Sequence, residues 1–326
     1  MRGPLNIHRV PSQPVLKAAV VGAGVFGRLH AAKYRALHDI ELIAIADPNA
    51  SARREGADRL RTAAVADWRE LLGKVDLVSI CSPALTHAEI VRNFLQSGAH
   101  VLVEKPIATT VQQADQLVGL ARARGLVLTV GHQERYVLAK SGLLRLRETP
   151  VLVDCVREGP WTGRGTDVSV ILDLMIHDLD LVHSLIPGPV ESVWADGSFV
   201  HGQSPDQVTA EIAFANGARA RLTANRAAGE RKRSLRLSYR AGGEIALDFL
   251  TREVANTTEA MVGPLDLSDP LAESVAGFVG AVRAGAPVLV RPEEALRALE
   301  TAIRIEEALA PVAAAAPKRA ALRRLA

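Results

Sequence analysis

Short apolar runs alternate with longer amphipathic stretches along residues 16–130. The apolar runs predict strands at residues 17–21, 41–46, 77–81, 100–103 and 127–130. The stretches between them predict helices at residues 26–37, 50–60, 68–72, 86–97 and 110–124. Repetition of strand and helix is typical of an α/β domain, in which helices cover both faces of a parallel, doubly wound sheet.

The pattern changes after about residue 150, where longer runs alternate apolar and polar positions. One hairpin is expected from residues 209–224, around an Asn216-Gly217 turn in which both residues would adopt positive φ. A second hairpin is expected from residues 234–250. The alternation predicts a mainly antiparallel sheet with one buried face. Four outward cations are expected to be solvated or to contact another subunit: Arg231, Lys232, Arg233 and Arg236.

These patterns divide the chain into two domains and a tail. Residues 1–135 are expected to form the first domain, with residues 1–15 as an N-terminal extension. Residues 136–310 are expected to form an α+β domain whose last helices return toward the first domain. Residues 311–326 are rich in alanine and basic residues and are expected to be a tail.

Composition and charge exclude several classes of protein. With 48% hydrophobic and 23% charged residues among 326, the chain is neither disordered nor collagenous. Its formal charge of +3 comes from the ends, because residues 1–17 and 311–326 hold seven basic side chains and no acidic one. The rest is slightly acidic, which argues against a nucleic-acid partner. Cys81 and Cys155 suit neither a disulfide framework nor a zinc site, no apolar run is long enough to span a membrane, and the cytoplasm is the expected compartment.

A glycine-rich turn follows the first expected strand. Gly22, Gly24 and Gly27 form a GxGxxG pattern that opens a helix, with Val25 and Phe26 at the helix start. Such a turn lets a pyrophosphate approach the backbone at the helix N-terminus. Asp47 ends the second strand, where a carboxylate accepts hydrogen bonds from a ribose diol and repels a 2′-phosphate. The pattern therefore predicts NAD as cofactor, with NADP disfavoured, while a nucleotide-free domain of the same fold is the alternative.

Three further polar segments lie at the carboxyl ends of expected strands, where doubly wound sheets bind ligands. They contribute candidate cofactor residues after the third and fourth strands, namely Ser82, Pro83, His87, Glu104 and Lys105. After the fifth strand they contribute candidate substrate residues, namely Gln133, Arg135 and Tyr136. A lysine that ends a buried strand is costly unless it is paired or used, which makes Lys105 a candidate for catalysis.

A second constellation lies on a predicted helix near residue 175. At about 100° per residue, Asp173, His177 and Asp180 share one face. Asp173 could then accept a hydrogen bond from one ring nitrogen of His177 and leave the other nitrogen free to act as a base. A metal site made of Asp173, His177 and His183 is disfavoured, because His183 falls off that face; no metal is expected.

Together, these motifs resemble the glucose–fructose oxidoreductase and inositol dehydrogenase family (Gfo/Idh/MocA). The resemblance rests on Gly22xGly24xxGly27, Glu104-Lys105-Pro106 and Asp173xxxHis177, in this order. It implies a Rossmann domain, an open-faced antiparallel sheet that packs in dimers or tetramers, and NAD(P)-dependent chemistry on a sugar or cyclitol. It also implies that Lys105, Asp173 and His177 are catalytic, and that Pro83 and His87 lie near the nicotinamide.

Residues 130–136 and 172–181 further resemble the bacterial UDP-N-acetylglucosamine 3-dehydrogenases. That resemblance implies oxidation of a nucleotide sugar at C3, followed by an aminotransferase that supplies lipid A synthesis. Arg157 and Arg164 are candidates for pairing with the diphosphate, because a guanidinium binds phosphate oxygens bidentately. Two alternatives stay open, a dehydrogenase for another sugar or inositol and a dinucleotide sensor without turnover.

Overall fold

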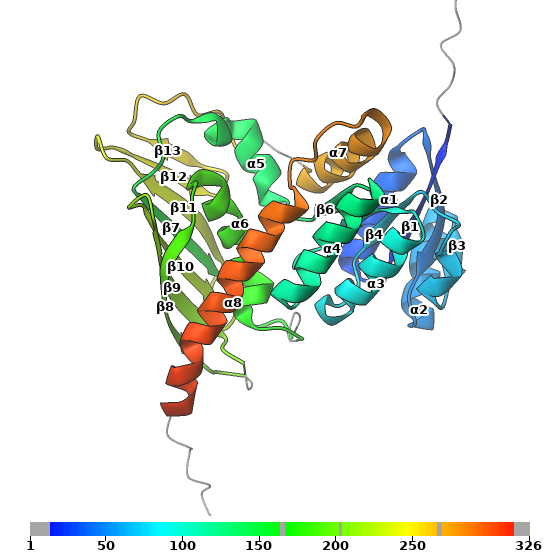
Figure 1. Cartoon of the computed structure of the whole chain (residues 1–326), viewed down its shortest axis with the longest axis horizontal. Helices are drawn as coiled ribbons and strands as arrows, with labels where there is room; N and C mark the ends of the chain where they lie inside the picture. The colour runs from blue at the N-terminus through cyan, green and yellow to red at the C-terminus, as the bar shows by residue number, and fades with distance from the viewer. Residues whose placement is uncertain (1–13, 164–166, 202–203, 266–268, 316–326) are drawn as a thin grey trace, which may run out of the picture.

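The computed structural model describes residues 14–163, 167–201, 204–265 and 269–315. Two sheets lie side by side, and a long helix, α8 (Pro292–Ala315), runs between them (Figure 1). Of the residues expected to form a basic tail, 316–326 lie outside the described part of the chain. Within the described part, no helix combines the length and apolar character needed to cross a bilayer.

The first sheet is parallel throughout and has six strands in the order β3-β2-β1-β4-β5-β6. Its strands are β1 (Leu16–Val21), β2 (Ile40–Ala46), β3 (Ala63–Val65), β4 (Leu77–Ile80), β5 (His100–Val103) and β6 (Leu128–Val130). Its helices are α1 (Val25–Ala36), α2 (Ala50–Leu60), α3 (Ala84–Gln96) and α4 (Val111–Arg124). The expected Rossmann architecture is confirmed, because the apolar runs are buried strands; the short strand β3 was not expected, and residues 68–71 form a 3₁₀ turn.

The second sheet has seven strands in the order β13-β12-β11-β7-β10-β9-β8 and is antiparallel except between β7 and β10. Its strands are β7 (Leu152–Glu158), β8 (Val190–Ser198), β9 (Gln207–Phe214), β10 (Arg219–Asn225), β11 (Lys232–Ser238), β12 (Glu244–Asp248) and β13 (Val254–Asn256). The Asn216-Gly217 hairpin is present, but only Gly217 has positive φ. The expectation for Asn216 is wrong because the connection between the strands is four residues long rather than two.

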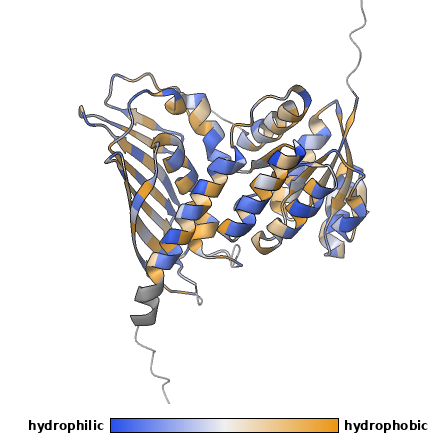
Figure 2. Ribbon diagram, in the orientation of Figure 1, coloured by the Kyte–Doolittle hydropathy of each residue, from blue (hydrophilic) through white to orange (hydrophobic). Residues whose placement is uncertain are grey.

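In the part of the chain that the structure describes, helices cover one face of the second sheet and leave the other face open. Burial alternates along its strands, and orange and blue positions alternate in Figure 2 accordingly. The covered face packs against α6 (Ile176–Leu185) and α8, and the core between them is continuous with that of the first domain. Two shorter elements, α5 (Glu134–Ser141) and a π-helical turn η3 (Ile171–Met175), lie between the sheets.

The last helices return to the first domain. Helix α7 (Pro270–Ala284) contacts α1 and β5, and α8 contacts α4 and β6. Thr129 at the end of the first sheet donates a hydrogen bond to the carbonyl of Val290, at 2.8 Å. The chain therefore ties the two sheets together at the carboxyl edge of the parallel one, where the polar segments lie.

Candidate active site

A cleft of about 690 Å³ opens at the carboxyl ends of β1, β4 and β5. The glycine turn, Phe26, Ser82, Pro83, His87, Glu104 and Lys105 all line it, as does Asp173 from the second domain. The carboxyl ends of parallel strands thus bring together residues more than 80 positions apart, as the sequence predicts.

The three glycines of the turn have different reasons to be glycine. Gly22 has φ +99°, and a Cβ there would lie 2.5 Å from the carbonyl oxygen of Cys81. A Cβ on Gly27 would lie 1.7 Å from the carbonyl oxygen of Gly22, so helix and turn touch there. A Cβ on Gly24 would meet no protein atom within 4 Å, and no side chain caps α1. The open space beside free helix-terminal amides fits the pyrophosphate of a dinucleotide.

Asp47 is held rigidly at the rim of the turn. Its carboxylate accepts the amide of Ala23 at 2.7 Å and that of Asn49 at 2.8 Å. Arg53 donates to the carbonyls of Asp47 and Pro48, so this cation is engaged by backbone. The geometry supports an acidic rather than a cationic partner for the ribose, which fits NAD.

Two buried histidines brace the loops around Lys105. The ring nitrogens of His87 lie 2.7 Å from the carbonyl oxygen of Pro106 and 2.9 Å from that of Ser82. His30, which the sequence analysis missed, bridges Ser79 and Glu104 at 3.1 and 2.9 Å. Burial lowers the pKa of His87. Burial alone would raise the pKa of Glu104, but the hydrogen bond and charge of His30 outweigh it and lower that pKa.

Lys105 is paired with Asp173 across the two domains. Its ammonium donates to the carbonyl oxygen of Asp173 at 2.7 Å and to its carboxylate at 3.1 Å. Asp173 lies in the π-helical turn η3, whose wider turn departs from α-helical spacing. Both side chains are about one-fifth exposed, at 19% and 21%, so a small molecule in the cleft can reach them.

The partner of His177 is a residue that the sequence analysis did not consider. Its Nδ1 lies 2.9 Å from a carboxylate oxygen of Glu134, at the start of α5. The expected hydrogen bond from His177 to Asp173 is therefore wrong, because η3 breaks the α-helical spacing and Asp173 pairs with Lys105 instead. Asp180, which was expected on the same face as His177, is fully buried.

Glu134 is itself held in position by the buried Arg157. Arg157 donates to Glu134 at 2.9 Å and to Asp178 at 2.8 Å. Burial alone would raise the pKa of Glu134, but its interactions with His177 and Arg157 outweigh it and hold that pKa well below its usual range. A run of Asp178, Arg157, Glu134 and His177 thus joins the interior to the site.

The structure places the candidate substrate residues in different surroundings. Arg157 is 3% exposed and committed to internal carboxylates. Arg135 is 4% exposed and pairs with Asp180 and Glu294. Tyr136 packs against the core, and burial raises its pKa. Gln133 lines a cavity, as described next, and Arg164 lies outside the described residues. The buried ion pairs explain why two of these arginines cannot leave the interior to meet a ligand.

A second cavity, of about 490 Å³, lies between α5, the His177 helix and the second sheet. It is lined by Gln133, Glu134, Val137, Leu174, His177, Arg233, Phe249, Arg252 and Leu265, among others. Four residues line both this cavity and the dinucleotide cleft: Phe26, Glu104, Lys105 and Asp173. Lys105 therefore lies where a nicotinamide and a substrate would meet.

His183, the third residue of the alternative metal site, makes another contact in the structure. His183 bonds Thr301 at 2.8 Å, and burial lowers its pKa to about 4. In the residues that the structure describes, no group of three histidine, cysteine or acidic side chains is arranged to hold a metal ion.

A dinucleotide cleft that opens beside a lysine and an oriented histidine defines an NAD-binding oxidoreductase. Comparison with known proteins gives the family. Residues 16–132 match the oxidoreductase family with an NAD-binding Rossmann fold, and residues 147–244 match the GFO/IDH/MocA C-terminal domain. The chain belongs to the Gfo/Idh/MocA family, as the sequence motifs predict.

Two relatives are informative. The chain is 33% identical over 310 residues to UDP-N-acetylglucosamine 3-dehydrogenase from Acidithiobacillus ferrooxidans, covering 90% of this chain and 97% of the relative. A solved structure of that enzyme superimposes with a TM-score of 0.83, covering 90% and 97% of the two chains. Myo-inositol 2-dehydrogenase from Thermotoga maritima is 27% identical and covers 56% of this chain and 58% of its own.

Proposed function

We propose that the protein uses NAD to oxidise a sugar ring hydroxyl, and that its substrate is UDP-N-acetylglucosamine, which becomes the 3-keto sugar. The observation that carries the proposal is the pair of cavities that meet at Lys105 and Asp173, with His177 facing the second cavity. The relative that oxidises this sugar matches the chain over nearly its whole length, whereas the inositol enzyme matches little more than half.

The cofactor is held by the glycine turn and Asp47, with Ser82 and Pro83 lining the same cleft. When bound, NAD supplies the acceptor for the hydride that leaves the sugar carbon. His177 takes the hydroxyl proton: its Nδ1 faces the ionised Glu134, so Nε2 carries the lone pair.

Lys105 stabilises the oxygen from which the proton leaves. A lysine ammonium has three donors, and Asp173 engages two of them. The third can donate to the substrate oxygen and stabilise the charge that builds there. Asp173 thereby orients Lys105 rather than His177. Neither a proton acceptor nor an oriented ammonium is needed by a sensor without turnover.

Three wider proposals accompany this one. The 3-keto product would serve an aminotransferase in lipid A synthesis. The uncovered sheet face, where Trp194 is 56% exposed, would form a homodimer or homotetramer. Cys81 and Cys155 are both free thiols, which fits a reducing compartment such as the cytoplasm.

The test is an absorbance assay of NADH formation with UDP-N-acetylglucosamine, N-acetylglucosamine and myo-inositol as parallel substrates. A keto-trapping aminotransferase removes the product so that an unfavourable equilibrium does not mask turnover. The nucleotide sugar should give the highest kcat/KM, and His177→Asn should lower kcat by roughly 10²–10⁴-fold with NAD affinity retained. Preferential oxidation of myo-inositol would overturn the substrate assignment.

A further inference from the structure

Two arginines form the wall of the substrate cavity contributed by the second sheet. Arg233 is the second residue of β11, and Arg252 lies in the turn between β12 and β13. Both line the cavity that His177 also lines. Among the described residues, no hydrogen bond or salt bridge engages either guanidinium group. They differ in this from Arg157, which lines the same cavity but is committed to two carboxylates.

The strand register explains why Arg233 reaches the cavity. Side chains alternate between faces, so Arg233 shares the face of Leu235 and Leu237, both of which are buried under the helices. Lys232 and Arg236 point to the uncovered face instead. Arg233 is exposed, as expected from the sequence, but it lies on the helix-covered side of the sheet and lines the cavity, unlike Lys232 and Arg236.

The charges around Arg233 leave the cavity wall positive. Its cross-strand neighbour is Arg157, a like charge directly opposite. Partial burial lowers the pKa of Arg233, and the positive charges of Arg157 and Arg231 lower it further. Glu134 raises that pKa, but its carboxylate is already bound to His177 and Arg157.

The other carboxylates that line the cavity also have partners within the protein. Glu104 binds His30, and Asp173 binds Lys105. Each carboxylate of the cavity therefore has a partner within the protein, and Arg233 and Arg252 are the cations of its lining that have none among the described residues. An anionic ligand would compensate both.

Arg252 lies in a turn whose backbone is fixed by hydrogen bonds. Arg252 has φ +64°, the left-handed conformation in which glycine is the usual residue. The turn is fixed by Asp248, whose carboxylate accepts the amides of Leu250 and Thr251 at 2.7 and 3.0 Å. A long cationic side chain therefore lies beside the cavity at a backbone conformation that favours glycine.

We propose that Arg233 and Arg252 form a subsite for the diphosphate of the nucleotide sugar. A guanidinium group binds phosphate oxygens through two parallel hydrogen bonds. Two guanidinium groups can therefore bind the two phosphoryl groups of a diphosphate. Arg157 and Arg164 were the sequence-based candidates for this role; Arg157 is occupied, and Arg233 and Arg252 replace it. The subsite rests on the proposed function for the identity of the sugar, but its ligand chemistry, an organic diphosphate, is independent of the carbon that is oxidised.

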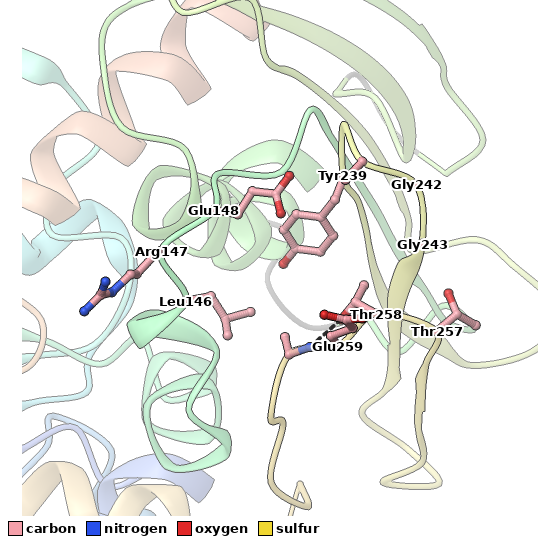
Figure 3. Close-up of a pocket in the computed structure, with 11 residues that line it drawn as sticks. Leu146, Arg147, Glu148, Tyr239, Gly242, Gly243, Thr257, Thr258 and Glu259 are labelled. Atoms are coloured by element: carbon pink, nitrogen blue, oxygen red, sulfur yellow. Dashed lines mark hydrogen bonds between the residues drawn. The ribbon is translucent and has the colours of Figure 1, made fainter.

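Another hollow of the second domain is unsuited to the same ligand. It has a volume of about 710 Å³ and lies between the α5–β7 connection and the β11–β12 turn, lined by Tyr239, Glu148 and Glu259 among others. Figure 3 shows Arg147 pointing away from it. Burial raises the pKa of Tyr239, and the negative charge of Glu148 raises it further. Two carboxylates against one arginine make this hollow less suited to a diphosphate than the wall that holds Arg233 and Arg252.

The test measures binding rather than turnover. UDP, N-acetylglucosamine 1-phosphate and N-acetylglucosamine are titrated calorimetrically into the NAD-saturated enzyme. UDP should bind more tightly than the monophosphate, and the neutral sugar should bind weakest. Arg233→Gln and Arg252→Gln should each weaken UDP binding by at least about tenfold, since each removes charge-assisted hydrogen bonds. Arg233→Lys should weaken it less than Arg233→Gln.

Arg236→Gln is the matched control, because Arg236 lies on the same strand but pairs with Glu244 on the uncovered face. It should leave UDP binding unchanged, and NAD binding by each variant verifies that it is folded. UDP binding that survives both glutamine substitutions, or an enzyme that binds N-acetylglucosamine but not UDP, would overturn the subsite. If UDP binding depends on the arginines but UDP-N-acetylglucosamine is not oxidised, the subsite stands and the proposed function fails.

Discussion

The Nδ1 atom of His177 lies 2.9 Å from the carboxylate of Glu134, a residue 43 positions earlier in the chain. Glu134 in turn is bound by the buried Arg157. In the proposed mechanism this makes Glu134 a positioning residue: it would fix which ring nitrogen of His177 faces the substrate.

Replacing Glu134 with glutamine tests that role, because the shape is kept and the charge is lost. We expect kcat to fall by roughly 10–100-fold with NAD affinity unchanged, as for other residues that orient a catalytic imidazole. The KM for the sugar should change much less than kcat, because the imidazole loses its orienting partner at 2.9 Å while the substrate cavity keeps its shape. A purely structural role would lower the melting temperature and raise KM along with the loss in kcat, and Glu134→Asp should restore part of the activity.

We expect Asp47 to set the choice between NAD and NADP. A carboxylate held by the amides of Ala23 and Asn49 repels a 2′-phosphate, so NADH should bind more tightly than NADPH. Asp47→Asn should narrow the difference by about tenfold, which corresponds to one hydrogen bond to a charged group. Fluorescence titration of both cofactors measures this, with Asp67→Asn, outside the cleft, as control. Tighter binding of NADPH by the unsubstituted enzyme would refute the argument.

Gly24 and Gly27 allow a matched pair of alanine substitutions. A Cβ at position 24 meets no protein atom and its φ of −65° suits alanine, so Gly24→Ala should keep its thermal stability and weaken NAD binding. A Cβ at position 27 collides with the carbonyl of Gly22, so Gly27→Ala should lose at least about 2 kcal/mol of stability. Thermal melts with and without NAD separate the two. Equal NAD affinity in the Gly24 variant would mean that the pyrophosphate does not lie there.

Buried histidines make stability depend on pH. Burial lowers the pKa of His132 and of His183 to about 4, so both are neutral in the folded protein at pH 5 to 6. The unfolded chain binds more protons than the folded one between pH of about 6.5 and 4, so the free energy of unfolding falls as the pH falls through that window.

Each such histidine contributes roughly 1.4 kcal/mol per pH unit within the window. His183→Asn should reduce the slope of unfolding free energy against pH by about that amount, measured by urea denaturation at several pH values. His38→Asn, at an exposed position, is the control. A slope that His183→Asn leaves unchanged would show that this histidine is not neutral in the fold.

The sequence by itself determined the parallel sheet, the glycine turn and the positions of Lys105 and Asp173. These follow from local patterns: apolar runs of strand length, glycines where a Cβ would collide, and the rule that parallel strands bring their carboxyl ends to one edge. The one-sided second sheet was equally readable, because alternation of apolar and polar residues is a property of each strand alone.

Only the tertiary structure decided which side chains meet. Lys105 pairs with Asp173 across 68 residues and His177 with Glu134 across 43, and the π-helical turn at residues 171–175 removes the local pairing that α-helical spacing suggests. It also decided which arginines are available: Arg135 and Arg157 are buried against carboxylates, whereas Arg233 and Arg252 face the cavity. The physical reason is that a charged group pairs with whatever opposite charge the packing of distant elements places beside it, and a sequence pattern does not contain that distance.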